Sequence, residues 1–324
     1  MSYSLAEFLI TDQWDYPFFK RLANNDTAAA PGHQGGMVIT QDLRQFFPTL
    51  EGRPSRVTPT IDRTIWAEMF LGLKQVAHGS LRYQFQTWGG RRSPESRITE
   101  GFGHLHRLAR GGDILIFQRR ADSIDFFRLI LVRKGTRMFR DVENVIGTRV
   151  RGQLFDDQPP ITAVELESAL QEIEELTNQS FSLTKVIRRL ESRQLRVARS
   201  SVFPLLVRQE YDFRCCVSGV RIETPYQIHE VEAAHVVPVI QGGTDDVRNG
   251  LSLSRTLHWA FDRGLFGIKD DRTVYIPTGV SRMEGNEFLK QFAGRSIASA
   301  QTERFRVHDD ALQWHRERVV AKWD

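Results

Sequence analysis

The sequence predicts a multidomain α+β protein with three parts, residues 1–158, 159–200 and 201–324. A chain of 324 residues, of which 40% are hydrophobic, can bury substantial cores and suggests about two domains. Short apolar runs rich in β-branched and aromatic residues fill the first part. Apolar residues at helical spacing mark the second part, and the third part mixes the two patterns.

Residues 1–158 have the pattern of a barrel or a sandwich of short strands. Strand-type composition marks the runs GMVIT, SLRYQFQTW, DILIFQRR and DFFRLILVRK. Breaks rich in Gly, Pro, Asn and Asp separate these runs, which favours a barrel or a sandwich over repeated βαβ units. The sequence DDQPP at residues 156–160 is typical of a domain boundary, so we expect the first part to end there.

The connector, residues 159–200, is predicted to be helical over residues 161–198. Thr162 and Glu165 have the spacing of a capping box, in which each side chain satisfies a free backbone N–H at a helix start. Apolar residues then recur every three or four positions and form one helical stripe, which can pack within the chain or against a second copy. The first stripe contains Leu166, Leu170, Ile173 and Leu176, and the second contains Val186, Ile187 and Leu190.

The third part, residues 201–324, is predicted to open with a helix over FPLLVRQEY and to close with a helix over ALQWHRERVVAKW. Between them, VEAAHVVP has the composition of a strand and SRTLHWAFD has the pattern of a helix. A loop rich in Gly and Asp joins the two. We therefore expect a strand, a loop and a helix in succession.

The charge distribution indicates a partner for the first part. The net charge is +4, and residues 1–158 carry 22 Lys and Arg against 17 Asp and Glu. Only 7 of the 44 basic residues are lysines, which leaves 37 arginines, and the planar arginine fork suits phosphate groups and guanine edges. A genome of high GC content, whose codons favour arginine, accounts for the arginine content equally well. The charge balance gives information about binding partners and not about the fold.

Several classes of protein are excluded by what the sequence lacks. No apolar run approaches a membrane span, and MSYSLAEFLITDQWDYPFF has neither the basic start nor the small-residue cleavage site of a signal peptide. We therefore expect a soluble protein of the prokaryotic cytoplasm with no membrane partner. The only cysteines, Cys215 and Cys216, are adjacent, which argues against a disulfide framework and excludes a four-cysteine zinc site. No GxxxxGK[ST] stretch indicates ATP dependence.

Residues with proton and metal chemistry gather in the third part. His235 ends the predicted strand, and Asn249 lies just before Gly250 at a turn. His258 and Asp262 are four residues apart on the predicted helix, so their side chains share one face and could hold one metal ion. A histidine can deprotonate water near neutral pH, and a divalent ion can stabilise the oxygen that leaves a phosphodiester.

These residues resemble the HNH endonucleases, whose active site is a ββα-metal motif. The resemblance covers about residues 201–320 and rests on CCVSGV, EAAHVVP, NGLSLSRTLHWAFDRGLFGI and the tail QWHRERVV. It implies that His235 is the general base and that Asn249 orients this base through a carbonyl. It also implies that His258 binds the catalytic metal ion.

The sequence departs from this family at Ala234, where many members have aspartate or histidine as the first metal ligand. Colicin-like members bind metal with a second residue four positions after the last histidine, which here is Asp262. We therefore expect His258 and Asp262 as protein ligands of Mg²⁺ or Mn²⁺, with waters and a DNA phosphate completing the shell. Glu232 and His229 are weaker candidates, and Glu232 alone shares strand parity with Ala234.

The first part contains a loop suited to reading DNA. Residues 88–103, WGGRRSPESRITEGFG, combine arginines, which bind guanine, with a glutamate, which can accept from the cytosine amino group. A solvated turn is the alternative explanation of this composition. Together with LANNDTAAAPGHQGGMVITQDLRQFF at residues 22–47, the loop resembles the N-terminal effector-binding domain of the EcoRII restriction enzyme family.

This second resemblance covers about residues 5–155 and implies a DNA-binding pseudobarrel with two arms that grip the major groove. Ser93 stands where the family has an arginine, and Val38 where it can have a polar aromatic residue, so the target sequence is expected to differ from the family's. Arg91 and Lys20 are expected to touch phosphates, which position a protein without specifying sequence. The predicted DNA-binding residues are Lys20, His33, Gln34, Arg91, Arg92, Glu95 and Arg97.

Together the sequence predicts a restriction-type DNA endonuclease. The first part would recognise a short sequence in double-stranded DNA, and the HNH domain would hydrolyse phosphodiester bonds with a divalent ion. One HNH site cuts one strand, which suggests a homodimer, and a restriction role in phage defence implies a cognate DNA methyltransferase that acts on the same sites.

Two other functions remain open at this stage. One is a modification-dependent endonuclease that reads a methyl group between apolar walls, for which Tyr83, Phe85 and Trp88 are candidates. The other is a non-cutting DNA-binding protein with a decayed HNH module, in which Ala234 would be the sign of decay.

Overall fold

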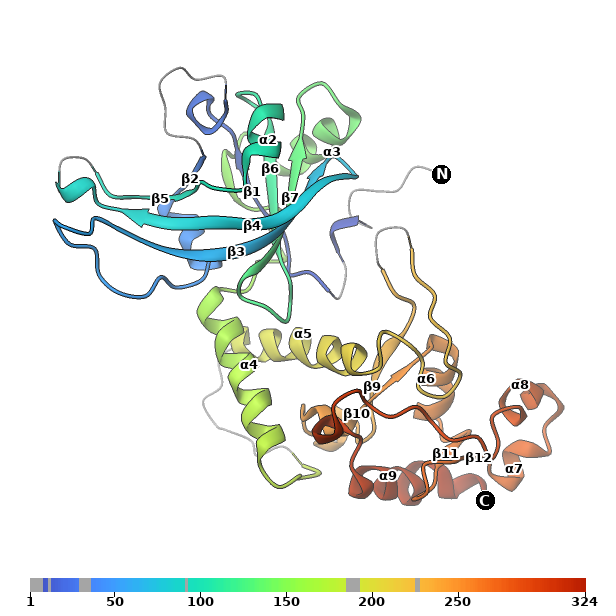
Figure 1. The fold of residues 1–324 in the computed structure, drawn as a ribbon. Coiled ribbons are helices and arrows are strands. Elements are labelled where there is room, and N and C mark those ends of the chain that lie inside the picture. Colours follow the sequence, from blue (N-terminus) through green and yellow to red (C-terminus); the bar gives the residue numbers. More distant parts are fainter. Residues whose placement is uncertain (1–7, 11–12, 29–35, 91–92, 185–192, 225–227) are drawn as a thin grey trace. The chain divides into compact units, whose positions relative to one another are not determined.

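The computed structural model describes residues 8–10, 13–28, 36–90, 93–184, 193–224 and 228–324. The chain forms two compact units, Met1–Glu167 and Ser168–Asp324 (Figure 1). The protein is of mixed α+β type. Within the described residues, no helix is both long enough and apolar enough to cross a membrane.

One curled sheet of eight strands, a half-barrel, builds the first unit (Figure 1). The order across the sheet is β2-β5-β4-β3-β7-β6-β1-β8, and neighbours are antiparallel except for β3 and β7. All four runs predicted from composition are strands. The strands are β1 (Phe18–Arg21), β2 (Met37–Ile39), β3 (Thr60–Leu71), β4 (Lys74–Gln86), β5 (Glu95–Ile98), β6 (Ile114–Arg119), β7 (Phe126–Val132) and β8 (Arg151–Gln153).

Short helices complete the first unit. They are α2 (Gly103–Leu108), α3 (Arg137–Ile146) and the 3₁₀ turns η1 (Asn24–Asp26), η2 (Gln41–Phe46) and η3 (Trp88–Gly90). The hydroxyl of Thr136 accepts a hydrogen bond from the Phe139 amide at 3.1 Å and so caps α3. These elements match the strand-rich domain with short helices that the sequence predicts.

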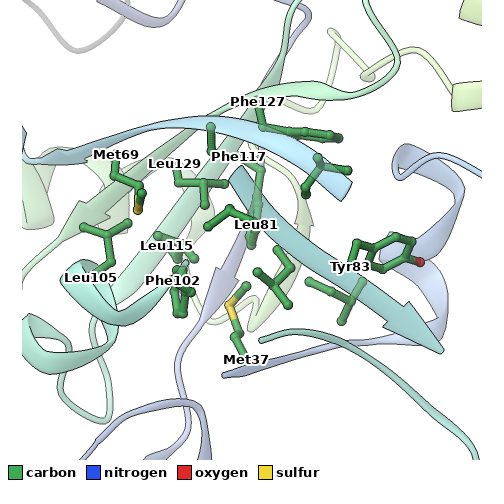
Figure 2. Packing of buried hydrophobic residues seen from close by; sticks show 14 of the residues in the cluster. Met37, Met69, Leu81, Tyr83, Phe102, Leu105, Leu115, Phe117, Phe127 and Leu129 are labelled. Carbon is green, nitrogen blue, oxygen red and sulfur yellow. The ribbon is translucent and has the colours of Figure 1, made fainter. Parts of the chain in front are cut away.

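A cluster of buried aliphatic and aromatic side chains forms the core of this unit (Figure 2), and several of its rings stack on one another. Phe18 stacks on Phe117 with ring centroids 4.9 Å apart, and Phe47 stacks on Tyr83 and on Phe127 at 5.0 Å. Each such side chain, when fully buried, stabilises the fold by about 1.5–3 kcal/mol. The rings come from β1, β4, β6 and β7 and from Phe47, the residue that follows η2, so the cluster joins strands that are distant in sequence.

A buried ion pair fixes the start of the connector. The Arg119 guanidinium lies 3.1 Å from the Asp15 carboxylate and donates to the Ile161 carbonyl at 2.6 Å. Asp15 also accepts from the Ile161 amide at 2.9 Å, and burial raises the pKa of this carboxyl to about 6. Helix α4 (Ala163–Asn178) follows directly, so its first turn is held against the sheet of the first unit.

The connector is less helical than the sequence predicts. The capping box is present, because the Thr162 amide donates to Glu165 at 3.1 Å and the Glu165 amide to the Thr162 hydroxyl at 3.3 Å. Helix α4 ends at Asn178, however, and residues 179–184 are not helical. The polar run NQS interrupts the apolar stripe at this point, which explains the end of the helix. The second stripe at Val186, Ile187 and Leu190 lies outside the described residues.

The described part of the second unit contains two two-stranded sheets, β9 with β10 and β11 with β12, together with helices (Figure 1). The expected strand, loop and helix are β9, the loop to β10, and α6, and the first and last helices of this part are also present. The elements are α5 (Arg193–Glu210), β9 (Glu232–His235), β10 (Gly250–Leu253), α6 (Arg255–Asp262), β11 (Gly267–Ile268), β12 (Val274–Tyr275), α7 (Thr278–Ser281), α8 (Glu287–Lys290) and α9 (Asp309–His315). Cys215 and Cys216 are buried free thiols.

Candidate active site

A β-hairpin followed by a helix presents the predicted catalytic residues. In the pair formed by β9 and β10, His235 lies opposite Gly250 and Glu232 lies opposite Leu253. Helix α6 starts immediately after β10, and the Ser254 hydroxyl caps it by accepting from the Leu257 amide at 3.4 Å. His258 therefore lies in the first turn of α6, directly after the hairpin.

His235 is held by a carboxylate and by an aromatic ring. Its Nε2 lies 3.2 Å from Oδ1 of Asp245, which comes from the loop between the two strands. Its ring stacks on Phe203 of α5 with centroids 4.0 Å apart. When the Nε2 proton is donated to Asp245, Nδ1 carries the lone pair of the neutral imidazole and can act as a base.

Asn249 closes the loop that carries Asp245. The side chain is fully buried, accepts from the Val237 amide at 2.8 Å and donates to the Val237 and Thr244 carbonyls at 3.0 and 2.9 Å. These bonds tie the residue next to Asp245 to the backbone that follows His235. Asn249 thus holds together the backbone on both sides of the loop, at Val237 and at Thr244.

Close packing of α5 on the hairpin requires glycine at position 250. A Cβ atom there would lie 2.4 Å from the Val207 side chain and 3.1 Å from the Phe203 ring. Phe203 is the ring on which His235 stacks. The small residue after Asn249 therefore permits the helix that supports the imidazole to approach the strand.

His258 lies between two carboxylates. Its Nδ1 is 2.9 Å from Oε2 of Glu232 on β9, and its Nε2 is 3.6 Å from Oδ2 of Asp262 on the same helix. The other oxygen of Glu232 lies 3.1 Å from Nε of Arg255. The expected proximity of His258 and Asp262 is therefore present in the structure.

Ala234 and His229 occupy different surroundings. Ala234 is fully buried opposite Leu251, so it packs in the core of the hairpin. His229 lies 2.9 Å from Glu223 and stacks on Phe213 at 4.2 Å, and burial lowers its pKa below the usual value. Of the two weaker ligand candidates, Glu232 is therefore the one that reaches His258.

The donor set suits a divalent ion held by two protein side chains. Among the described residues, no group of three or more His, Cys, Asp or Glu is arranged to hold a metal ion. The nitrogen of His258 and the oxygen of Asp262 are 3.6 Å apart. Two ligands each about 2.1 Å from one ion lie roughly 3.0–3.6 Å apart at ordinary bond angles. The spacing of the two donor atoms is thus compatible with one shared ion.

The predicted phosphate contact at Lys20 does not fit the structure. Lys20 is 7% exposed, and its ammonium group lies 2.7 Å from both the Asp26 carboxylate and the Val38 carbonyl. Asp26 also accepts from the Val38 amide at 3.1 Å. The pair therefore ties β1 to β2 through buried bonds, which leaves the ammonium unavailable to a phosphate.

The other predicted DNA-binding residues gather near β5 or lie outside the described residues. The Arg97 guanidinium is 3.5 Å from the Glu95 carboxylate, and Arg97 is buried where β5 runs between β2 and β4. The remaining four, which the structure does not describe, are His33, Gln34, Arg91 and Arg92.

A pocket of about 250 Å³ opens beside the aromatic core of the first unit. Phe47, Tyr83 and Phe85 line it, and the Arg44 guanidinium lies 5.2 Å from the centre of the Phe85 ring. Two of the three aromatic candidates for a methyl-reading wall, Tyr83 and Phe85, therefore share one pocket. Trp88 is not among the lining residues.

Comparison with known protein families identifies one segment of the second unit. Residues 215–269 match the family model described as HNH endonuclease. These residues form an HNH endonuclease domain. The family's activity is that of a nuclease, which hydrolyses phosphodiester bonds. The match contains the whole hairpin and α6, so His235, Asn249, His258 and Asp262 all belong to the HNH domain.

The other comparisons add less. Among solved structures, a modification-dependent restriction endonuclease, TagI, aligns with 92% of this chain and 97% of its own at 15% sequence identity and a TM-score of 0.31. A TM-score of 0.31 does not indicate a shared fold. No curated protein matches the sequence.

Proposed function

We propose that the protein is a restriction-type DNA endonuclease that cuts with its HNH domain. The observation that carries this proposal is that the matched segment places His235 beside Asp245 and His258 beside Asp262 on one ββα unit. A base that can accept a proton and a nitrogen–oxygen pair that can hold an ion are the two groups that phosphodiester hydrolysis requires.

In this mechanism His235 accepts the proton of the attacking water at Nδ1. The Asp245 carboxylate, 3.2 Å from Nε2, holds the ring and stabilises the imidazolium that forms. Asn249 keeps the loop closed, so that Asp245 stays on the far side of the ring. The His235 side chain is 21% exposed, so a phosphate would have to reach it through that exposed part.

His258 and Asp262 are the residues that would hold Mg²⁺ or Mn²⁺. When bound, such an ion supplies Lewis-acid stabilisation of the charge that develops on the phosphate and the leaving oxygen. The oxygen ligand and the open coordination positions suit a hard cation. Alanine at position 234 is compatible with this arrangement, because the carboxylate of Asp262 supplies the second protein ligand.

The first unit would select the DNA. We propose residues 1–158 as an EcoRII-type pseudobarrel that binds a short duplex sequence, residues 159–200 as a helical linker and residues 201–324 as the nuclease domain. The excess of basic residues in the first 158 positions supports this division of labour. Glu95 and Arg97, together with His33, Gln34, Arg91 and Arg92, would read the bases, and a cognate methyltransferase would protect the host sites.

A plasmid cleavage assay tests this proposal. Wild-type protein and His235→Ala are incubated with Mg²⁺ and matched unmodified or cytosine-methylated plasmid. We expect discrete cuts in unmodified DNA and a rate about 10²- to 10⁴-fold lower in the variant, because that is the usual contribution of a general base. Binding without cleavage of either substrate, with Mn²⁺ also tried, would support the decayed module instead.

A modification-dependent endonuclease is the second candidate. The pocket lined by Phe47, Tyr83 and Phe85 favours it, because aromatic walls can enclose an apolar group such as a methyl on a base. Cleavage of methylated plasmid alone, lost in Phe85→Ala, would establish this function in place of the first.

A further inference from the structure

We propose that Glu232 is a positioning residue that fixes His258 with Nε2 directed toward Asp262 and the metal ion. This inference rests on the proposed function. Glu232 would act through His258, because its carboxylate lies at Nδ1 of that ring and not at Nε2, where Asp262 lies.

The two nitrogens of His258 have different partners. Nδ1 lies 2.9 Å from Oε2 of Glu232, within hydrogen-bonding distance. Nε2 lies 3.6 Å from Oδ2 of Asp262, beyond a good hydrogen bond but suited to a shared ion. A neutral imidazole has one N–H, and an ionised carboxylate only accepts. The proton therefore belongs on Nδ1, which leaves the lone pair on Nε2 for the metal.

Glu232 is itself held in place. It is the first residue of β9, opposite Leu253, which precedes the cap of α6 by one residue. Its second oxygen lies 3.1 Å from Nε of Arg255, the first residue of the helix. The backbone amide of Arg255 donates to the Glu230 carboxylate at 2.8 Å. Glu232 in β9 and Glu230, two residues before it, therefore both hold the start of the helix.

The direction of Glu232 excludes it as a third ligand in this arrangement. Its carboxylate is at Nδ1, whereas Asp262 is at Nε2, on the opposite edge of the ring. An ion bound between Nε2 and Asp262 is therefore separated from Glu232 by the imidazole. Carboxylates that accept from the free N–H of a metal-bound histidine fix its tautomer and increase its basicity, and their loss weakens metal binding about 10- to 100-fold.

The test is Mn²⁺ affinity of the full chain without DNA, measured by calorimetry or by the paramagnetic signal of free Mn²⁺. We expect Glu232→Ala to weaken binding about 10- to 100-fold. Glu232→Gln should restore most of the affinity, because its amide oxygen can still accept from Nδ1–H. Glu287→Ala removes an exposed carboxylate of α8 and is the control for the change of charge.

The tautomer supplies a readout independent of metal. In ¹⁵N spectra of the metal-free protein, the ring of His258 should carry its proton on Nδ1 in the wild type and in Glu232→Gln. Glu232→Ala should lose this preference while its thermal unfolding stays close to that of the wild type. A proton on Nε2 in the wild type would overturn the proposal.

The outcomes separate this inference from the proposed function. If His258→Ala and Asp262→Ala abolish Mn²⁺ binding while Glu232→Ala binds as tightly as the wild type, the positioning role of Glu232 is wrong and the metal site stands. If His258→Ala and Asp262→Ala leave Mn²⁺ affinity unchanged, the metal site of the proposed function is wrong, and the role of Glu232 falls with it.

Discussion

At the scale of single residues, each of the two imidazoles of the candidate active site, His235 and His258, has a carboxylate partner from another element. Asp245 of the loop meets His235 of β9, and Glu232 of β9 meets His258 of α6. A carboxylate on one ring nitrogen fixes the tautomer and so decides what the other nitrogen can do. The chemistry of this site therefore depends on two pairs rather than on two histidines.

The Asp245–His235 pair leads to the first prediction. Asp245→Asn keeps the shape of the side chain but removes the charge that stabilises the imidazolium. Because a hydrogen bond to a charged group is worth about 1.5–3 kcal/mol, we expect kcat for cleavage to fall about 10- to 100-fold with DNA affinity unchanged. Single-turnover cleavage and a binding titration in Ca²⁺ measure the two quantities separately.

A double variant provides the control for this prediction. If Asp245 acts only through His235, Asp245→Asn adds no further loss to His235→Ala. Additive losses would indicate that Asp245 contributes independently of the imidazole and would contradict the pairing as the source of its effect.

Residue-level prediction from sequence succeeds where partners are local. His258 and Asp262 are found together because the helical repeat places residues four apart on one face. Asp245 gives no such signal, because nine residues lie between it and His235, and the hydrogen bonds of Asn249 to Val237 and Thr244 that close this segment cannot be read from the sequence. Lys20 is misassigned because formal charge does not reveal that Asp26 and Val38 enclose the ammonium.

At the scale of elements, composition identifies the strands but not their order. The runs rich in β-branched and aromatic residues are strands because such side chains pack well on a pleated surface. The sheet order depends on contacts such as β1 with β8, which pair Lys20 with Arg151, far apart in the chain. Strand propensity contains no information about which strands pair with one another. For this reason the sequence alone does not distinguish a barrel from a sandwich.

The packing of α9 on α6 leads to a second prediction. His315 stacks on Phe261 at 3.7 Å, its Nε2 is 2.9 Å from the Phe261 carbonyl, and burial lowers its pKa from 6.5 to about 4. As the pH falls, the imidazole of His315 is therefore protonated in the unfolded state before it is protonated in the folded state. The stability that the neutral ring contributes is complete above pH 6.5 and is lost as the pH falls toward 4. The shift corresponds to about 3 kcal/mol.

Chemical denaturation at a series of pH values checks this prediction. We expect the free energy of unfolding of the second unit to fall between pH 6.5 and 4, and His315→Phe to remove about 3 kcal/mol of that fall. Phenylalanine keeps the ring stack but cannot titrate, although it leaves the Phe261 carbonyl without its partner. An identical pH dependence in the variant would exclude His315 as the titrating group.

At the scale of the whole molecule, the chain contains one HNH domain, and one site hydrolyses one strand at a time. The proposed restriction function requires both strands to be cut, so two copies must act on one duplex. We therefore expect nicked plasmid to form in proportion to protein concentration and linear plasmid to rise more steeply. Gel quantitation of nicked and linear forms over a concentration series measures this difference.

Mixing the active and inactive protein tests the same requirement from the other side. When wild-type protein is mixed with excess His235→Ala, a dimer on the DNA has one working site, so nicked plasmid should accumulate while linear plasmid declines. At protein concentrations so low that each duplex has only one bound copy, the wild type alone should also give nicked rather than linear plasmid. The opposite outcome is that linear plasmid forms without a nicked intermediate at every concentration and that excess His235→Ala does not suppress it. A single copy would then cut both strands, and the dimer would not be needed.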